Sequence, residues 1–447
     1  MIFRTVLKEF AQGRSGAEKS DGQGTRARLS PRLRASARAL LLLAFASPAQ
    51  ADTLIDNING ISLNADGKVD RFNGVLIGDD GRIEQVLTRS DKRPGKVDYK
   101  LDGKGRVLIP GLIDAHVDLM ELGLAQLTGE DAPPEARPRP EDLDLALNKV
   151  QQLLLERGVT TVTDMGTTIE DWQAYRRAGD LGTLRLRIIA YAEGADAMIL
   201  IGGPGPSTWL YDDRLRLNGV TLVLDGTAPA KAKLSDTQLK NLMSRAAMDN
   251  FQVAVEAHGE PASRVLLDAV DELAQTYKGE RRWRIEGADA VAAADLPRFS
   301  RAGVIASLLP RSDSSRAMKP LADAGTRLAF GSGGPLSPPQ PFAGLAAAVG
   351  RPTAAPATEG AWPVAQALPR EAAFAAYTTG AAYAAFADGR LGQVAAGRRA
   401  DFLLIDQDPL LAAPEDLAKV RVLETWVGGK RLYQAKDAPP PPAAEGR

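Results

Sequence analysis

The sequence contains no cysteine, and its 447 residues include only two histidines, His116 and His258. The absence of cysteine excludes disulfide bonds, thiolate metal sites and cysteine nucleophiles. Charge of one sign is also lacking, because 55 Lys and Arg residues stand against 56 Asp and Glu residues. We therefore expect no basic surface for nucleic acid and no acidic interaction tail. A chain of this length, with 44% hydrophobic residues, can bury a large core.

The first 51 residues resemble an export signal rather than part of the fold. Basic residues between Arg26 and Arg38 precede a short apolar run, residues 39–46, and then the motif Ala49-Gln50-Ala51. This three-part pattern is typical of a secretory signal peptide, and the run is shorter than the ~20 residues of a membrane-spanning helix. We predict that residues 1–51 are a signal peptide with an upstream extension. The mature protein is then expected in the periplasm or outside the cell, with no membrane span.

Strand patterns occur at both ends of the remaining chain. Residues 53–87 alternate apolar and polar side chains around an Asp79-Asp80-Gly81 turn, and residues 400–433 repeat the pattern near the other end. Because chain ends commonly lie close together, these strands are predicted to form one small composite β-sandwich lobe. The predicted lobe comprises residues 52–107 and 391–435.

Between these ends, short apolar runs alternate with amphipathic helical stretches. Residues 141–158 place Leu143, Leu147, Val150 and Leu154 on one helical face, and Ser235 is an expected helix N-cap. Eight apolar runs separated by helices predict an α/β fold, a closed parallel (β/α)8 TIM-like barrel over residues 108–390. The expected strands are 108–118, 158–165, 184–192, 219–226, 251–259, 282–288, 302–310 and 326–334. The Pro-rich tail, residues 436–447, is expected to be disordered.

Residues 107–123, VLIPGLIDAHVDLMELG, resemble the first-strand motif PGxIDxHxH of the amidohydrolase superfamily. Five later segments resemble its amidohydrolase-3 branch: GVTTVTDMGT, GPGPSTWLYDDRLRLNGV, RIEGAD, LAFGSGGP and LGQVAAGRRADFLLIDQDPL. The resemblance implies a barrel with a composite β lobe. It also implies metal-dependent hydrolysis of carbon–nitrogen bonds other than peptide bonds, with one or two divalent metals at the carboxyl ends of the strands.

The same resemblance locates the metal ligands, and only His116 matches. Asp118 stands at the second histidine of the H-x-H pair, and Glu256 stands at the histidine of the fifth strand. Three further positions carry no usable ligand: Thr221 for the lysine, Gly287 for the sixth-strand histidine, and Gly333 for the aspartate that shuttles protons. We therefore predict a degenerate, pseudoenzyme-like member with no catalytic residue and no cofactor. It would keep a pocket for a small-molecule ligand at the barrel mouth.

Two alternatives remain open. His116 and Asp118 are two residues apart on a strand, as are Glu256 and His258, so each pair points in one direction. If both pairs face the mouth, they form a rebuilt site for Zn, Fe or Mn, and the protein is an active hydrolase of an amide-like substrate. The other alternative is an interaction partner of an intact paralogue, because barrels can lose chemistry while keeping their fold.

Three further features have less specific interpretations. Asp114 and Asp164 lie near predicted strand ends, where a carboxylate either lines the pocket or caps the following helix. The glycines and prolines of residues 202–209 predict a turn over the barrel mouth. The sequence itself identifies no substrate, partner or oligomeric state.

Overall fold

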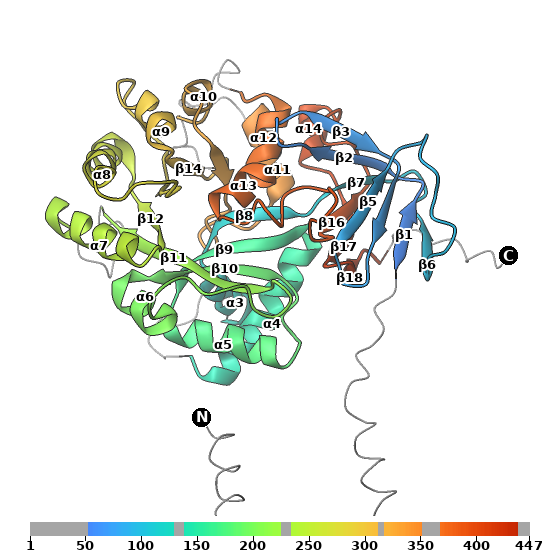
Figure 1. Cartoon of the computed structure of the whole chain (residues 1–447), viewed down its shortest axis with the longest axis horizontal. Coiled ribbons are helices and arrows are strands. Elements are labelled where there is room, and N and C mark those ends of the chain that lie inside the picture. The colour runs from blue at the N-terminus through green and yellow to red at the C-terminus, as the bar shows by residue number, and fades with distance from the viewer. Residues whose placement is uncertain (1–51, 129–137, 225–233, 312–316, 351–366, 437–447) are drawn as a thin grey trace, which may run out of the picture. The chain divides into compact units, whose positions relative to one another are not determined.

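The computed structural model describes residues 52–128, 138–224, 234–311, 317–350 and 367–436. The predicted signal peptide, residues 1–51, and the predicted disordered tail from residue 437 onward lie outside these ranges. The described residues form a barrel flanked on one side by two β-sheets (Figure 1).

Eight parallel strands form one sheet in sequence order, and each predicted apolar run contributes one strand. The sheet closes between its first and last strands, where the Gly333 amide donates to the His116 carbonyl and the Asp118 amide to the Gly334 carbonyl, both at 2.9 Å. The predicted TIM-like fold class is therefore confirmed. The strands are β8 (Leu112–Val117), β9 (Val159–Thr167), β10 (Arg187–Glu193), β11 (Leu215–Val223), β12 (Gln252–Glu256), β13 (Arg284–Glu286), β14 (Ile305–Leu308) and β15 (Leu328–Phe330).

The helices follow the apolar periodicity of the sequence. Helix α4 (Pro140–Glu156) buries Leu143, Leu147, Val150 and Leu154, which form the face that the periodicity predicts. Ser235 is the N-cap of another, since its hydroxyl accepts from the Gln238 amide at 3.3 Å. The helices are α3 (Leu119–Thr128), α4 (Pro140–Glu156), α5 (Ile169–Asp180), α6 (Gly194–Gly202), α7 (Asp236–Met248), α8 (Gly259–Leu273), α9 (Leu296–Ala302), α10 (Met318–Asp323), α11 (Pro341–Val349), α12 (Arg370–Tyr377), α13 (Thr379–Ala384) and α14 (Pro414–Leu417).

The lobe beside the barrel is built from both chain ends. A four-stranded sheet has the order β5-β4-β1-β6, and a six-stranded sheet has the order β18-β17-β16-β7-β2-β3. Apolar side chains of both sheets, among them Ile55, Val75, Phe402 and Trp426, share one buried cluster, as in a β-sandwich. The strands are β1 (Thr53–Asp56), β2 (Asn59–Leu63), β3 (Val69–Phe72), β4 (Gly74–Ile77), β5 (Ile83–Leu87), β6 (Tyr99–Asp102), β7 (Val107–Pro110), β16 (Phe402–Ile405), β17 (Val422–Val427) and β18 (Lys430–Gln434).

The Gly- and Pro-rich segment after α6 does not lie over the barrel mouth, so that expectation is wrong. The Ser207 amide donates to the Leu217 carbonyl at 3.0 Å, near the amino-terminal start of β11. Helix α6 itself carries the chain from the carboxyl end of β10 back to this opposite end of the barrel. The glycines and prolines therefore form the connection into β11 on the face remote from the mouth.

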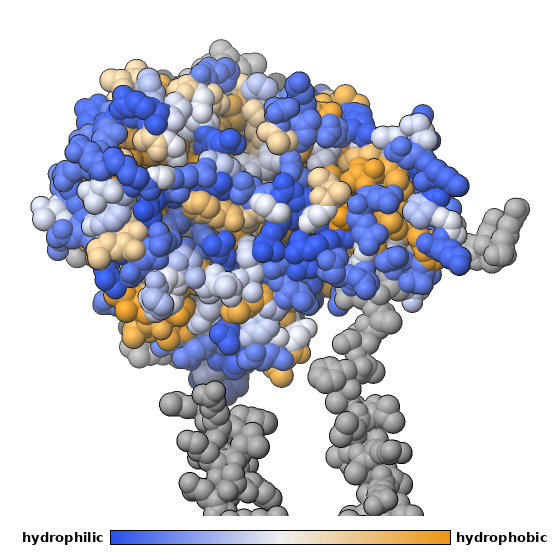
Figure 2. All heavy atoms as spheres, in the orientation of Figure 1, coloured by the Kyte–Doolittle hydropathy of each residue, from blue (hydrophilic) through white to orange (hydrophobic). Residues whose placement is uncertain are grey.

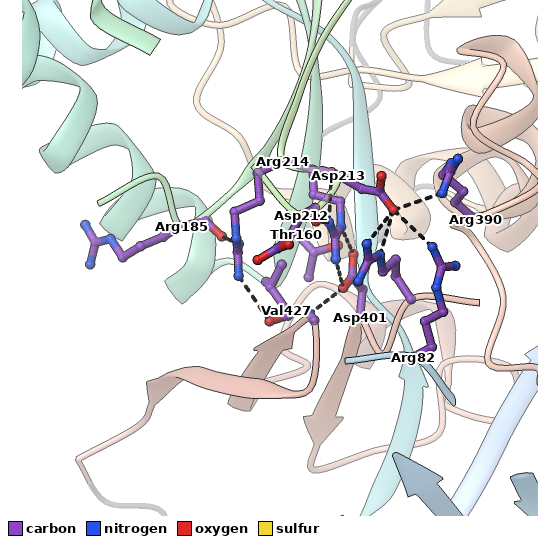
Figure 3. A network of polar contacts seen from close by, with 12 residues as sticks. Arg82, Thr160, Arg185, Asp212, Asp213, Arg214, Arg390, Asp401 and Val427 are labelled. Atoms are coloured by element: carbon purple, nitrogen blue, oxygen red, sulfur yellow. Dashed lines mark hydrogen bonds and ion pairs between the residues drawn. The ribbon is translucent and has the colours of Figure 1, made fainter. Parts of the chain in front are cut away.

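At this amino-terminal end, a network of arginines and carboxylates joins the barrel to the lobe (Figure 3). Arg187 of β10 makes a bidentate ion pair with Asp401, with nitrogen–oxygen distances of 2.6 and 2.8 Å, and both side chains are buried. Asp213, which precedes β11, accepts from Arg399 at 2.7 Å, from Arg390 at 3.0 Å and from Arg82 at 3.3 Å. Burial alone would raise the pKa of Asp213, but its arginine neighbours lower it.

The outer surface shown in Figure 2 is largely hydrophilic, with separate groups of apolar side chains. The most exposed large apolar residues include Leu336, Leu181, Leu411 and Leu200. No helix within the described ranges is both long and apolar enough to cross a membrane.

Candidate functional site

A buried group of charged side chains crosses the barrel interior below its mouth. The imidazole Nδ1 of His116, at the end of β8, lies 2.8 Å from the Glu286 carboxylate on β13. The other oxygen of Glu286 lies 2.6 Å from Nε of Arg284, and both of these side chains are fully buried. Arg284 also donates to the Ala115 carbonyl at 2.6 Å. The three side chains therefore tie β13 to β8 through the middle of the barrel.

These contacts set the protonation of His116. Burial opposes a charged imidazole, but the hydrogen bond to Glu286 and the charges of Glu286, Asp118 and Glu256 outweigh it and raise the pKa of His116 to about 9. Burial likewise opposes ionised Glu286, yet Arg284 and His116 lower the pKa of this carboxyl to about 2. At neutral pH the group therefore holds an imidazolium, a carboxylate and a guanidinium.

A pocket of about 410 Å³ opens at the carboxyl ends of β8, β9, β10 and β12. This end of a (β/α)8 barrel is where such barrels carry their binding and active sites. Seven carboxylates line the pocket, and among the described residues its lining contains no lysine, arginine or histidine. The acidic residues are Asp118, Glu121, Asp164, Glu170, Asp171, Glu193 and Glu256. The described lining of the pocket is therefore rich in carboxylates and also has an apolar wall, which includes Met120, Leu124 and Leu143.

Asp164 is a buried carboxylate of this pocket, and its surroundings change its pKa. Asp164 is 1% exposed and accepts from the Leu119 amide at 2.9 Å and the Tyr175 hydroxyl at 2.8 Å. Burial, together with the negative charges of Asp171 and Asp118, raises the pKa of Asp164 to about 7. Asp164 thus lines the pocket and also caps α3, rather than the helix that follows its own strand.

The second aspartate considered from the sequence has a different place. Asp114 is buried in β8, and its carboxylate accepts from the backbone amides of Ser332 at 2.9 Å and His116 at 3.2 Å. Burial raises the pKa of Asp114. It neither caps a helix nor lines the acidic pocket, because it fixes the turn after β15 against β8.

The structure brings only part of the predicted metal set together. Asp118 and Glu256 line the same pocket, and His116 lies near enough for both charges to affect its pKa. His258 is 40% exposed, and its Nδ1 lies 3.8 Å from the Asp289 carboxylate. Across the described part of the chain, no group of three or more His, Asp or Glu side chains is arranged to hold a metal ion.

Comparison with known sequences identifies the family. A sequence model of the amidohydrolase family matches residues 128–433. The chain belongs to the amidohydrolase family. It is 30% identical over 340 residues to Protein LONG AFTER FAR-RED 3 of Arabidopsis thaliana, an alignment that covers 64% of this chain and 57% of that protein. It is 24% identical over 320 residues to the N-substituted formamide deformylase of Arthrobacter pascens, with coverage of 62% and 58%. The chain thus spans less than two thirds of the length of these relatives.

Solved structures show the same fold at low identity. An uncharacterised metal-dependent hydrolase from Pyrococcus furiosus is 20% identical with a TM-score of 0.66, covering 80% of this chain and all of that one. A zinc-bound adenosine deaminase from Xanthomonas campestris is 18% identical with a TM-score of 0.61, covering 85% and 92%. At these identities the likeness concerns the fold alone.

The three positions without a usable ligand do not fit the metal centre that the family resemblance implies. Thr221 is buried, and its hydroxyl donates to the Met165 sulfur at 3.5 Å. Gly287 and Gly333 have φ angles of 71° and 69°, which disfavour any side chain. A Cβ added at Gly287 would meet the His258 ring, with Nδ1 at 2.5 Å, and one added at Gly333 would meet Leu309 at 2.7 Å. The backbone and packing at both glycines are therefore adapted to the absence of a side chain.

Most of the charged residues at this site were not predicted from the sequence. Arg284 and Glu286 are two residues apart on one strand, so their shared direction could have been inferred from the segment RIEGAD. A charged pair on a strand covered on both faces must find partners inside the barrel. The carboxylates of α3 and α5 gave no comparable signal, because acidic residues in the first turn of a helix are common caps.

Proposed function

We propose that this amidohydrolase-family protein is exported, does not carry out metal-dependent hydrolysis, and binds a small cationic molecule in the acidic pocket. The observation that carries the proposal is the lining of that pocket, whose described residues include seven carboxylates and no cationic side chain. A pocket of about 410 Å³ suits a small organic amine or guanidine. Burial and the negative charges of Asp171 and Asp118 raise the pKa of Asp164, and a cationic ligand would offset the repulsion between these carboxylates.

An organic cation suits this pocket better than a metal ion does. The carboxylates come from several elements and, within the described residues, do not converge on one point as metal ligands must. The apolar side chains of Met120, Leu124 and Leu143 would contact the carbon skeleton of an amine. Ordinary metal ligation would leave this apolar wall without a role.

The rebuilt metal site is a second candidate, favoured by one observation. A metal-binding histidine usually donates its other ring nitrogen to a carboxylate, and His116 makes such a contact with Glu286. Hydrolysis would then depend on His116, Asp118, Glu256 and His258. The packing of Thr221 and the backbone conformations of Gly287 and Gly333 argue against metal-dependent hydrolysis.

Two measurements test the proposal. Elemental analysis of protein purified without chelator should find zinc, iron and manganese well below one atom per chain. Calorimetric titration with putrescine and agmatine should give saturable binding that weakens with ionic strength, whereas the neutral alcohol 1,4-butanediol should not bind. About one metal per chain, with amide hydrolysis that is lost in His116→Ala, would instead establish the second candidate.

Matched variants locate the binding. Asp118→Asn and Glu256→Gln each remove one charge from the pocket and should weaken amine binding about 10-fold, since a hydrogen bond to a charged group is worth roughly 1.5–3 kcal/mol. Glu84→Gln, an exposed position in the lobe, is the control and should bind as the unmodified protein does. Equal binding by all three variants would refute this location.

A further inference from the structure

A second pocket, of about 260 Å³, lies on the other side of the β8–β15 junction and shares no lining residue with the acidic pocket. It is bounded by the segments that follow β14 and β15 and by the end of α12. Its described lining differs in chemistry, with one arginine, one tyrosine and no carboxylate. The lining residues include Leu309, Arg311, Leu336, Pro338 and Tyr377.

Tyr377 brings a hydroxyl donor to this pocket. It is 4% exposed, and its ring packs edge-on against Phe330 with centroids 5.3 Å apart. Its hydroxyl has no hydrogen-bond partner among the described residues. The hydroxyl packs against Gly344, where a side chain would displace it. Burial raises the pKa of Tyr377, so its hydroxyl stays protonated and remains a hydrogen-bond donor at every physiological pH.

Arg311 brings the only charge to the described part of the lining. Its guanidinium donates to the Pro338 carbonyl at 3.2 Å, and it forms no ion pair with a carboxylate in the described part of the chain. The remaining guanidinium nitrogens can therefore bind an anion in the forked geometry that arginine offers to a carboxylate.

The rest of the wall is apolar. Leu309, Leu336 and Pro338 line the pocket, and Leu336 is 98% exposed at its rim. An exposed leucine beside a pocket can cover the carbon skeleton of a ligand, and removing that surface from water favours binding.

We propose that this pocket binds a small organic carboxylate with an apolar body. Arg311 pairs with the carboxylate, the Tyr377 hydroxyl donates to one of its oxygens, and Leu309, Leu336 and Pro338 contact the apolar body. The site does not depend on the acidic pocket, so it stands even if no amine binds there.

The test is calorimetric titration of the full chain with phenylacetate, its neutral amide phenylacetamide, and its cationic analogue phenethylamine. Phenylacetate should bind saturably and at least 10-fold more tightly than the amide. Arg311→Gln should weaken phenylacetate at least 10-fold and leave the amide unchanged. Tyr377→Phe, which keeps the ring packing on Phe330, should weaken both the acid and the amide about 3- to 10-fold, because each offers an oxygen acceptor.

Arg89→Gln and Tyr99→Phe make the same changes at exposed positions of the lobe, and both should bind as the unmodified protein does. The proposal is overturned if phenylacetate shows no saturable binding up to about 10 mM, a concentration above even a weak dissociation constant of about 1 mM. It is also overturned if Arg311→Gln and Tyr377→Phe bind phenylacetate unchanged while retaining the thermal stability of the controls.

Discussion

The two histidines of the chain have contrasting surroundings. His116 is held inside the barrel by Glu286 and lies near the acidic pocket, whereas His258 stands partly exposed beyond β12 with its ring against Gly287. The Nδ1 of His116 lies 2.8 Å from the Glu286 carboxylate, whereas the Nδ1 of His258 lies 3.8 Å from the Asp289 carboxylate. The residue that matches the family motif is therefore one whose charge is fixed by its neighbours.

This difference can be measured by proton NMR, since only two imidazole signals are expected. The signal that disappears in His116→Gln should titrate in the unmodified protein with a midpoint near pH 9, the raised pKa of His116. Asp118→Asn should lower that midpoint, because the Asp118 carboxylate favours the imidazolium. A midpoint below pH 7 would show that the Glu286 contact is absent in solution.

Asp164 should make the folded protein less stable as pH rises. Its pKa is about 7 in the fold and about 3.9 in an unfolded chain, so between these values the unfolded chain ionises and the folded one does not. The free energy of unfolding should fall across about pH 4–7, by up to about 1.4 kcal/mol per pH unit from this group. In Asp164→Asn that contribution should vanish, as urea denaturation at a series of pH values can check. Parallel curves for the two proteins would contradict the assignment.

At the scale of single residues, the sequence predicted which residues occupy the family's motif positions better than it predicted which side chains contact them. The two glycines and the surviving His116 could be located from motifs alone. The pairing of His116 with Glu286 could not, because it joins residues 170 positions apart through the closed barrel. The carboxylates of the acidic pocket come from elements whose approach depends on the whole fold.

At the scale of elements, the loop after β12 and the loop after β13 are fitted to one another. The His258 ring occupies the space beside Gly287, and the positive φ of Gly287 suits a residue without Cβ. The imidazole that the family resemblance places on the sixth strand is thus absent, and the ring from the fifth strand takes the neighbouring space.

This fit predicts coupling between the two loops. Gly287→Ala should destabilise the protein through its φ angle, by about 1 kcal/mol or more, and through contact with the His258 ring. In a His258→Ala background only the first effect remains, so the loss should be smaller. A double-mutant cycle by thermal denaturation measures the difference. Additive losses would mean that His258 moves away freely.

Periodicity located the strands because each buried strand is a short apolar run between helices. It could not locate the segment after α6, whose glycines and prolines look alike at either end of a barrel. The position of this segment follows from α6, which runs from the carboxyl end of β10 toward the start of β11. It therefore depends on how the elements are connected and not on the composition of the segment.

At the scale of the whole molecule, the predicted export signal can be tested directly. The motif Ala49-Gln50-Ala51 predicts cleavage before Asp52. Amino-terminal sequencing of protein from the native host should therefore begin at Asp52, and the protein should be recovered outside the cytoplasm. An intact residue 1 in the native protein would exclude export by this signal.

A buried ion pair between Arg187 and Asp401 is one of the contacts that join the lobe to the barrel. Arg187 is 1% exposed and Asp401 is 6% exposed, so Asp401→Ala would leave a buried guanidinium without its carboxylate. The Gly428 amide, which donates to Asp401 at 2.7 Å, would lose its partner as well. We expect a loss of about 3–5 kcal/mol in the free energy of unfolding, measured by chemical denaturation.

The matched control is Asp408→Ala, which breaks the pair of Asp408 with Arg71, an arginine whose side chain is 50% exposed. There water can solvate the remaining charge, so the loss should be at most about 1 kcal/mol. Because Arg187 belongs to β10 and Asp401 directly precedes β16, the larger loss should be accompanied by protease cleavage between barrel and lobe. Equal losses in the two variants would mean that hydrophobic packing, and not the ion pair, holds the lobe in place.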